Sequence, residues 1–307
     1  MPTVYVLLAA VLWSTGGLGV KSVDMPPLAL AGFRSAFAVP VLGVAALILA
    51  RRHDVPVFAS GGLLRRPLVW AAAFSYAVMV VSFVIAAKLT TAANAILLQY
   101  SGPIYVALLS WPVLRERVRA TDIAATVLCF FGMCLFFLDR VSSQGRIGDL
   151  VAIVSSFGFA GVPLLMRLEH TRRPNEPRPN SRRPASGGSG GAALGPAVAM
   201  TLGNLIACVA AGPAMLHAVS SPIGLGGWGA VVFLGVFQIG VAYVLYAAAV
   251  NALPALRSTL LATIEPILNP LWVAIVRGEK PTKWAAIGGV VILVSVTLQA
   301  IVRVERK

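Results

Sequence analysis

Residues Ala92–Val118, AANAILLQYSGPIYVALLSWPVLRERV, decide the fold because a diverged copy of this stretch returns later in the chain. The copy occupies Ala255–Lys280 and reads ALRSTLLATIEPILNPLWVAIVRGEK. Subtracting 92 from 255 gives an offset of 163 residues, which places Pro103 on Pro266. An internal repeat in an apolar chain is typical of secondary transporters, whose substrate site lies between the two halves.

The match extends without a gap over Phe83–Leu135 and Tyr246–Leu298. Each copy contains a short charged turn thirteen residues after its repeated proline. The turn holds Glu116 in the first copy and Glu279 in the second. A carboxylate in such a turn can accept backbone N–H groups at the start of the next helix and pair with a nearby arginine. We therefore interpret both glutamates as structural.

The composition places the chain in a membrane. Its 307 residues have a mean hydropathy of +0.85 and only 12% charged residues, which excludes an ordinary water-soluble domain. Apolar segments long enough to span the roughly 30 Å of hydrocarbon occur at Val4–Val20, Ala29–Ala50, Leu68–Ala87, Ala92–Leu114, Ile123–Leu138, Leu150–Met166, Ala192–Leu216, Trp228–Val250, Ala255–Val276 and Trp284–Val302. We expect an all-α membrane protein with ten transmembrane helices as two inverted five-helix repeats, because an odd number of spans turns the second copy upside down.

The net charge of +14 would suggest a nucleic-acid partner in a soluble protein, but here the cations follow the topology. Lys and Arg favour cytoplasmic loops, and most of the 25 lie in segments that are cytoplasmic if both termini are inside. We expect an integral protein of the bacterial inner (plasma) membrane, with N- and C-termini cytoplasmic and no nucleic-acid partner. The first span precedes Lys21–Asp24 without a convincing cleavage site, so we expect it to be retained.

A cytoplasmic linker interrupts the second copy. Residues His170–Gly191 read HTRRPNEPRPNSRRPASGGSGG, a composition that cannot bury enough apolar surface to become ordered. The predicted domains are 1–140, the first five-helix repeat, and 141–307, the second repeat with a disordered linker at about 170–191. Binding of its arginines to anionic lipid or to a cytosolic partner stays open.

No metal or cofactor is expected. The three cysteines, Cys129, Cys134 and Cys208, lie in apolar segments where a small buried side chain is the simplest interpretation. The three histidines lie in three different loops, so their spacing does not predict a metal cluster.

Three charged residues, Arg34, Arg257 and Glu265, fall inside predicted spans. Arg34 and Glu265 stand out among them, because a charge at the bilayer centre costs about 2.5–3.5 kcal/mol on insertion scales. Glu265 is expected about 15 Å deep, near the midplane, and Arg34 about 7 Å from the outer surface, at 1.5 Å per residue. A direct or water-bridged pair between them is compatible with these depths. Snorkelling of Arg34 to the outer interface is the alternative.

Other polar residues accompany these charges at mid-depth. Interhelical hydrogen bonding alone would explain any one of them, but together they predict a hydrated cavity of substrate size. The candidate substrate-binding or coupling residues are Glu265, Arg34, Trp13, Ser14, Tyr76, Asn94, Gln99, Tyr100, Asn204, Gln238, Tyr243, Tyr246 and Asn269.

The repeated stretch carries a family resemblance. Together with Trp13 in the first span, Arg34 in the second and the pair Glu265–Pro266, it resembles the EamA-type members of the drug/metabolite transporter superfamily. The resemblance covers nearly the whole chain and implies ten helices in two inverted repeats and a carrier or exporter of small metabolites such as amino acids. Arg115, where glycine is common, and the long linker depart from the family pattern.

We therefore expect a secondary transporter, not an enzyme, that exports a small polar or amphipathic metabolite by alternating access. Arg34 would attract a substrate carboxylate or hold Glu265, and Glu265 would link transport to protons or another cation. A membrane-embedded enzyme or a lipid-handling protein without transport coupling is the alternative. It would require a nucleophile–base pair, a metal cluster or paired carboxylates at depth, and Glu265 is the one deep acid in the sequence. The sequence leaves open whether the protein is a monomer or a homodimer.

Overall fold

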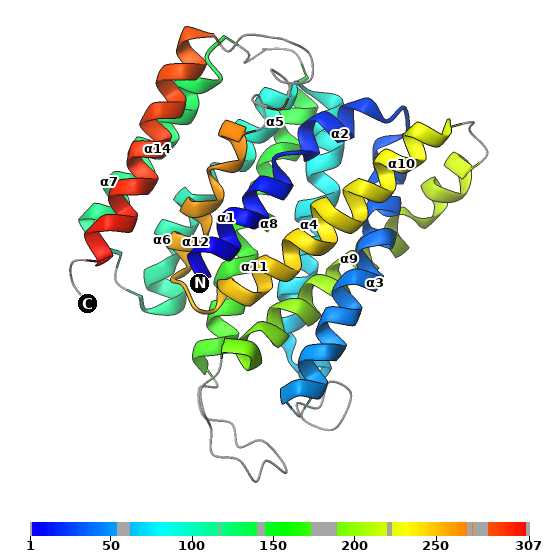
Figure 1. Cartoon of the computed structure of the whole chain (residues 1–307), viewed down its shortest axis with the longest axis horizontal. Helices are drawn as coiled ribbons and strands as arrows, with labels where there is room; N and C mark the ends of the chain where they lie inside the picture. The colour runs from blue at the N-terminus through cyan, green and yellow to red at the C-terminus, as the bar shows by residue number, and fades with distance from the viewer. Residues whose placement is uncertain are drawn as a thin grey trace.

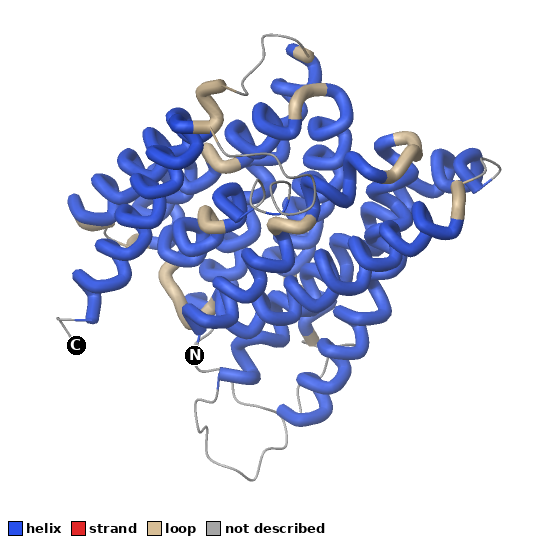
Figure 2. The backbone as a smooth tube through the Cα atoms, turned by 45° about the horizontal axis from the view of Figure 1, so that its top comes forward, coloured by secondary structure: helices blue, strands red, loops and turns tan. Residues whose placement is uncertain are grey.

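The computed structural model describes residues 2–53, 62–116, 118–139, 145–172, 189–219, 223–268, 272 and 282–304. These residues form helices joined by turns, without a strand among them (Figure 2). The helical stretches long and apolar enough to cross a membrane number seven in this part of the chain: Pro2–Ser22, Pro27–Arg52, Pro67–Leu89, Asn94–Leu114, Arg146–Arg172, Ala193–Val219 and Leu225–Val250. Two shorter apolar helices are Ala120–Phe136 and Lys283–Val296. The prediction of an all-α membrane protein is confirmed.

The continuous helices extend beyond the apolar segments from which they were predicted, except that α7 ends two residues before its segment does, because polar residues at the ends of the others are also helical. They are α3 (Pro27–His53), α4 (Pro67–Leu89), α7 (Ala120–Phe136), α8 (Arg146–Arg172), α9 (Ser189–Val219) and α14 (Lys283–Val304). A short 3₁₀ turn, η1 (Leu63–Arg65), precedes α4.

Other predicted spans are interrupted. Their pieces are α1 (Pro2–Trp13) and α2 (Gly16–Ser22), α5 (Ala92–Gln99) and α6 (Gly102–Leu114), and α10 (Leu225–Phe233), the π-helical segment η2 (Leu234–Val241) and α11 (Ala242–Val250). The span predicted at Ala255–Val276 begins with α12 (Ala255–Ala262), turns at residues 263–264 and is helical again at 265–268; apart from Trp272, its remainder lies outside the described residues.

The repeated prolines mark the same kind of break in both copies. Pro103 is the second residue of α6, directly after a turn at Tyr100 and Ser101. Pro266 is likewise the second residue of a helical segment that follows the turn at residues 263–264. Proline lacks the N–H that a helix interior needs but is accepted in its first turn. The duplicated proline is therefore a duplicated helix break.

Two groups of helices form the centre of the molecule. In the first group, which we name the α8 bundle, α8 packs along α4 and against α5 and α6. In the second, the α1 bundle, α1 packs along α11 and against η2 and α12, while α10 continues η2 and α2 continues α1. Figure 1 shows α1, α8 and α12 in the middle of the molecule.

The remaining helices pair at the two sides of these bundles. At one edge of Figure 1, α7 lies beside α14, and at the other edge α3 lies beside α9. The α7–α14 crossing is close enough to require glycine, since a Cβ atom at Gly288 would overlap the backbone of Gly132 and of Phe136. Small residues at helix crossings are typical of membrane proteins, where close packing replaces the hydrophobic effect between helices.

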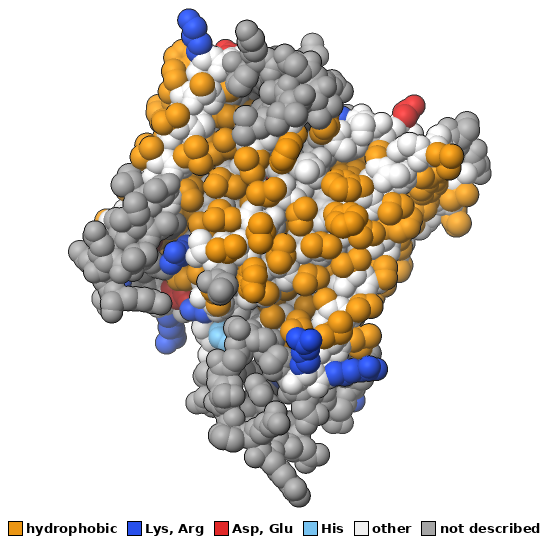
Figure 3. Space-filling model, viewed as in Figure 1, with side chains coloured by type: hydrophobic (Ala, Val, Ile, Leu, Met, Phe, Trp, Pro, Cys, Tyr) orange, Lys and Arg blue, Asp and Glu red, His pale blue; other side chains and the backbone are white. Residues whose placement is uncertain are grey.

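The outer surface suits a hydrocarbon environment. Large apolar side chains remain exposed along several helices, including Phe74 on α4, Trp111 on α6 and Val127 on α7, which are each more than 60% exposed. Figure 3 shows apolar side chains covering the middle of one face, with Lys and Arg side chains near its margins. A soluble protein would not expose an apolar surface of this extent.

The predicted linker is shorter than expected at both ends. Residues 170–172 still belong to α8 and residues 189–191 already belong to α9, because an apolar helix that ends near the membrane surface continues into adjoining polar residues. The remaining part, residues 173–188, lies outside the described residues.

Candidate functional site

A narrow cavity lies between the two bundles, in the interior of the molecule. The α8 bundle contributes Met79, Val80, Phe83, Gln99, Tyr100 and Phe159 to its lining. The α1 bundle contributes Trp13, Gln238, Ile239, Tyr243 and Glu265, and α3 contributes Arg34. Arg34 and Glu265, the two candidate charged residues, therefore line one cavity, together with five other predicted residues: Trp13, Gln99, Tyr100, Gln238 and Tyr243.

The helix breaks explain why polar groups meet here. Trp13 is the last residue of α1, and Tyr100 follows the last residue of α5, so both side chains lie where a span is interrupted. Gln238 lies in the π-helical segment, whose wider turn changes the direction of side chains relative to an α-helix and occurs frequently at functional sites. Non-helical backbone at membrane depth is tolerated where it lines a cavity or is buried in protein.

Arg34 points into the protein and does not snorkel. Its side chain is 2% exposed, and its Nη2 atom donates a hydrogen bond of 2.7 Å to Oε1 of Gln238. Gln238 lies in turn 3.4 Å from the carbonyl oxygen of Trp13, to which its Nε2 atom donates. The Nε and Nη1 atoms of Arg34, like Nε1 of Trp13, are buried without a hydrogen-bond partner among the described residues. The cavity is thus lined by several N–H groups that can donate to an anion.

Glu265 lies on the other side of the same cavity. The hydroxyl of Tyr100 donates to its Oε2 atom at 2.5 Å and also lies 3.1 Å from the carbonyl oxygen of Ala262. Glu265 retains partial exposure, unlike Arg34. No ion pair within 4 Å joins Glu265 to Arg34 among the described residues, so the positive and the negative group face one cavity without neutralising each other directly.

Aromatic rings form one wall of the site. The ring of Tyr243 lies 4.8 Å from that of Trp13 and 4.8 Å from that of Tyr76, measured between centroids. Tyr246 extends this wall, at 5.3 Å from Trp13. Tilted and edge-to-face arrangements at these distances are favourable for aromatic pairs. The wall offers an apolar surface directly beside the guanidinium of Arg34.

Hydrogen bonds behind the lining hold it in place. Gln99 donates to Oγ of Ser155 at 2.9 Å, and Ser155 donates to the carbonyl of Met79 at 3.0 Å. Asn204 contacts the hydroxyl of Tyr76 at 3.2 Å and donates to the carbonyl of Met200 at 2.9 Å. Asn204 and Tyr76 therefore support the aromatic wall from α9 and α4 without lining the cavity themselves.

Two other predicted residues lie elsewhere, and a third is not described. Asn94 is in the first turn of α5, where its side chain donates to Oδ1 of Asp149 at 3.0 Å and its backbone is capped by Thr91. Ser14 is buried at the break after α1 and accepts a hydrogen bond of 2.7 Å from Nε1 of Trp272. Asn269 lies outside the described residues.

Sequence reasoning missed the apolar part of the lining, which consists of Met79, Val80, Phe83, Phe159 and Ile239. These side chains belong to strongly apolar helices, and nothing in their spacing distinguishes a cavity-lining residue from a core residue. The repeat offers a partial signal, because Met79, Val80 and Phe83 lie just before or at its start in α4.

The cavity is small in this conformation. It offers water-sized molecules about 30 Å³ of room, whereas pockets for small ligands typically measure about 300–1,000 Å³. A larger depression on the outside of α6 and α7 has an almost entirely apolar lining, which includes Ile123, Val127 and Phe131, and belongs to the lipid-facing surface. A metabolite could enter the charged cavity only if the two bundles moved apart.

The chemistry present is binding chemistry. Among the described residues there is no group of three or more His, Cys, Asp or Glu that could hold a metal ion. The cavity combines one guanidinium, one carboxylate, two carboxamides and several aromatic rings. Such a set can hold a solute with separate anionic and apolar parts.

Comparisons with known proteins show a family and a fold to which the chain is similar. The sequence model described as "EamA-like transporter family" matches residues 2–138 and 189–300. An "Uncharacterized transporter YwfM" of Bacillus subtilis (strain 168) is 28% identical over 297 residues, covering 93% of this chain and 89% of its own length. An "Uncharacterized transporter" of Archaeoglobus fulgidus is 28% identical over 293 residues, covering 95% and 94%. A solved crystal structure of 19% identity superposes with a TM-score of 0.72 over 98% of both chains, which is a likeness of fold.

Proposed function

The chain belongs to the EamA-like transporter family, and we propose that it is a secondary transporter which exports small amphipathic metabolites, such as amino acids or related compounds, by alternating access. The observation that carries this proposal is the cavity between the α8 and α1 bundles, which places Arg34 and Glu265 together inside a membrane protein. Charged side chains at membrane depth are costly and mark substrate or ion pathways.

We further propose that residues 1–140 and 141–307 are two inverted repeats of five helices that exchange their first helices, since α8 packs with α4, α5 and α6 while α1 packs with η2, α11 and α12. One pair of contacts supports this two-fold relation. Gly16 packs against Gln238, and Gly161 packs against Ser75. The residues of these contacts correspond between the halves. The stretch Leu150–Met166 resembles Leu7–Lys21 at a shift of roughly 145 residues, because the linker comes only after it, and 161 minus 16 gives 145. The later helices correspond at 163, and 238 minus 75 gives 163.

The α7–α14 crossing supports the same relation independently. Gly132 meets Gly288, and Ser295 donates a hydrogen bond of 2.7 Å to the carbonyl of Ala125. Adding 163 to 125 gives 288, and adding 163 to 132 gives 295, so each contact maps onto the other. Rocking of two such halves about a central site is the transport movement that inverted repeats permit.

The cavity favours a substrate with a carboxylate. Arg34 has two N–H sites without a partner, and a planar guanidinium binds a carboxylate well with adjacent donors. The rings of Trp13 and Tyr243, which line the cavity, would contact the apolar part of the same molecule. Buried donors are unfavourable when unpaired, so the N–H groups of Arg34 favour a solute that brings an anionic group to them.

Glu265 is the group that we assign to coupling. Protonation would remove its charge and weaken its hydrogen bond with Tyr100, which links α12 to the break after α5 across the cavity. Proton binding would thereby change the contact between the bundles. We also propose that the protein lies in a bacterial inner membrane with both termini cytoplasmic, as the distribution of Lys and Arg indicates.

The alternative of a membrane enzyme or lipid-handling protein has less support. Intramembrane catalysis through a metal or through two carboxylates requires a metal-binding cluster or a second carboxylate beside Glu265, and the described cavity lining contains neither. A scaffold function for residues 173–188 would leave the charged cavity without a use. Deletion of residues 175–190 separates these views, because a transporter should retain transport.

The decisive experiment is a panel of amphipathic solutes on reconstituted liposomes, with and without a pH gradient, comparing wild type with Glu265→Gln. We expect a pH gradient to accelerate transport by the wild type and not by the variant. Glu169→Gln is the matched control, since Glu169 lies outside the cavity in an ion pair with Arg66. A normal pH response of Glu265→Gln would refute the coupling role, and failure of the wild type to move any solute would refute the transport function.

A further inference from the structure

Each end of the cavity is crossed by one cation that joins the two bundles. At the end where the linker leaves α8, Nη1 of Arg167 donates a hydrogen bond of 2.8 Å to the carbonyl oxygen of Asn251. Arg167 belongs to α8, and Asn251 follows α11, so this bond runs from the α8 bundle to the α1 bundle. At the opposite end, Nζ of Lys88, in the last turn of α4, donates to the carbonyl oxygen of Val23 at 2.7 Å. Val23 follows α2, so the second bond also joins the two bundles.

Both bonds end at the same kind of acceptor. Asn251 is the C-cap residue of α11 and Val23 is the C-cap residue of α2. The last carbonyl groups of a helix lack partners within the helix and carry the negative end of its dipole. A lysine or arginine beside them is favourable, and such a bond forms only while the two helix ends are adjacent.

The two bonds occupy corresponding places in the two halves. Subtracting 163 from 251 gives 88, so the turn that accepts from Arg167 in the second half corresponds to the turn that carries Lys88 in the first. Arg167 lies near the end of α8, and Val23 directly follows α2, which ends the first span of the other half. The donor is therefore on the first helix of one half at one end and on the third helix of the other half at the opposite end. Both bonds join the corresponding pair of helix ends.

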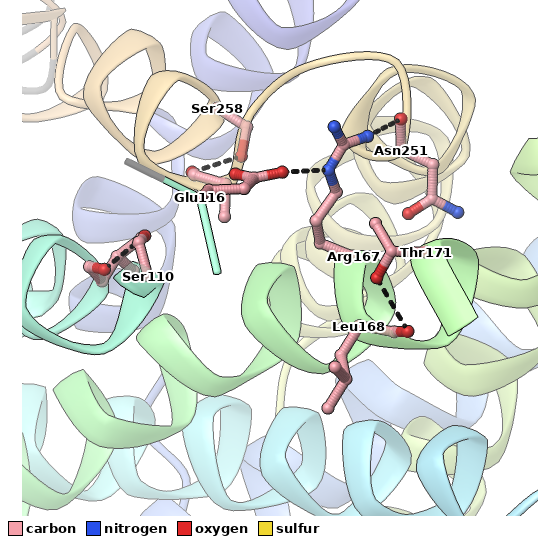
Figure 4. Close-up of polar contacts among 9 residues, drawn as sticks. Ser110, Glu116, Arg167, Leu168, Thr171, Asn251 and Ser258 are labelled. Atoms are coloured by element: carbon pink, nitrogen blue, oxygen red, sulfur yellow. Dashed lines mark hydrogen bonds and ion pairs between the residues drawn. The ribbon is translucent and has the colours of Figure 1, made fainter. Parts of the chain in front are cut away.

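The two ends differ in one respect. Glu116 accepts a second hydrogen bond from Arg167, at 2.7 Å from its Nε atom, and both side chains are partly buried, at 27% and 22% exposure. Figure 4 shows Arg167 between the carboxylate of Glu116 and the carbonyl of Asn251. Glu116 follows α6 of the same bundle as Arg167, so it orients the guanidinium and does not itself cross the cavity.

We propose that Arg167, positioned by Glu116, and Lys88 are alternating latches that close the two ends of the transport cavity. Each latch breaks when the helix ends beside it separate, and the described conformation, in which both are closed, is the occluded state. The proposal explains why the cavity is too small for a metabolite. It also gives Glu116 the role of orienting the guanidinium of Arg167. It rests on the proposed transport function but makes a statement about access that can be tested without a substrate.

A second ion pair at the same end provides the control. Arg66 contacts Glu169 at 2.9 Å, with 17% and 10% of the two side chains exposed. Arg66 precedes α4 and Glu169 belongs to α8, so this pair lies within the α8 bundle and does not join it to the α1 bundle. Its exposure and its length resemble those of the Arg167–Glu116 pair. Breaking it should leave access to the cavity unchanged.

The test measures access to a cysteine in the cavity from each side of the membrane. Val80→Cys provides the reporter, in the full chain with Cys134 and Cys208 replaced by alanine; Cys129 is buried and sets the background. Vesicles of both orientations are treated with a membrane-impermeant maleimide, and the labelling rate is compared among variants. No transported solute is needed, so failure of the latches and failure of the transport function give different results.

We expect Arg167→Gln to raise labelling about fivefold from the side that carries the linker and not from the other side. Glu116→Gln should give a smaller rise on the same side, Lys88→Met a rise on the opposite side, and Arg66→Gln no change. Equal effects of Arg167→Gln and Arg66→Gln, or a rise from both sides, would overturn the proposal. If Arg167→Gln does not give a monodisperse protein, Glu116→Gln and Lys88→Met decide the matter by the same criteria.

Discussion

Arg34 lies in the first half of the chain and Glu265 in the second, and neither has a charged counterpart in the other half. With the offset of 163 residues, Arg34 corresponds to Ala197 and Glu265 to Gly102. The helix contacts behave differently, because the contact of Gly132 with Gly288 has a counterpart in that of Ser295 with Ala125. The frame is therefore repeated while the charges of the cavity occur once each.

This difference has a consequence for the substrate. A symmetric frame supplies two equivalent ways of opening, one toward each side of the membrane. An asymmetric pair of charges lets a solute with an anionic end bind in one orientation only. Under the proposed function, the repeated helix contacts would determine the movement, and the unrepeated residues would determine which solute is transported.

The largest effect is expected from the unrepeated charge of Arg34. Arg34→Gln should lower the transport of a carboxylate-bearing solute about 100-fold, because hydrogen bonds to charged groups contribute about 1.5–3 kcal/mol. Arg34→Lys should retain part of the activity, since it keeps the charge and loses the paired N–H groups of the guanidinium. Initial transport rates in liposomes, normalised to the amount of inserted protein, measure both effects.

A matched substrate sharpens this prediction. An analogue whose carboxylate is replaced by a carboxamide should be transported equally by wild type and by Arg34→Gln. If Arg34→Gln reduces transport of both solutes equally, Arg34 serves the frame and not the substrate, and the distinction between repeated contacts and unrepeated charges fails.

A somewhat smaller effect is expected from the repeated frame. Gly288→Ala should destabilise the protein by about 2 kcal/mol, because its Cβ atom would overlap the backbone of Gly132 and Phe136. Gly289→Ala is the control on the next residue, where the nearest atoms lie 3.5 Å from an added Cβ atom. The midpoints of thermal denaturation of the two purified variants, measured in detergent, test this prediction. Equal midpoints would contradict the close approach of α7 and α14 at Gly288.

The sequence was sufficient for the fold class and for the charged centre of the site. The length of the apolar segments predicts helices, because a helix needs about 20 apolar residues to cross the bilayer. The free-energy cost of a charge in the membrane identifies Arg34 and Glu265 as candidates from the sequence alone. Trp13, Gln99 and Tyr243 were found by the same argument about polar or amphipathic groups at depth.

Other features could not be predicted, for physical reasons. Its depth predicts Asn94 in the cavity, yet its backbone N–H donates to the capping residue Thr91 and its side chain donates to Asp149. The position of Asn94 at the start of α5 depends on a turn that hydropathy does not show. Phe159 lines the cavity although it resembles any other apolar residue of α8. The bond of Arg167 to the carbonyl of Asn251 involves no side chain of Asn251, so no sequence pattern records it.

The smallest effect is expected from the contact between Tyr100 and Glu265. Tyr100 lies at a helix break that both halves share, whereas Glu265 has no charged counterpart in the other half. Tyr100→Phe removes the hydroxyl that donates to Glu265 and should slow transport about tenfold, because a hydrogen bond to a charged group contributes at least about 1.5 kcal/mol. Tyr105→Phe is the control, because Tyr105 stacks on Phe157 with ring centroids 4.4 Å apart and does not line the cavity. The same liposome assay, run with and without a pH gradient, measures both variants. An equal loss in the two would mean that the hydroxyl of Tyr100 serves only helix packing, and that the coupling assigned to Glu265 does not pass through the break after α5.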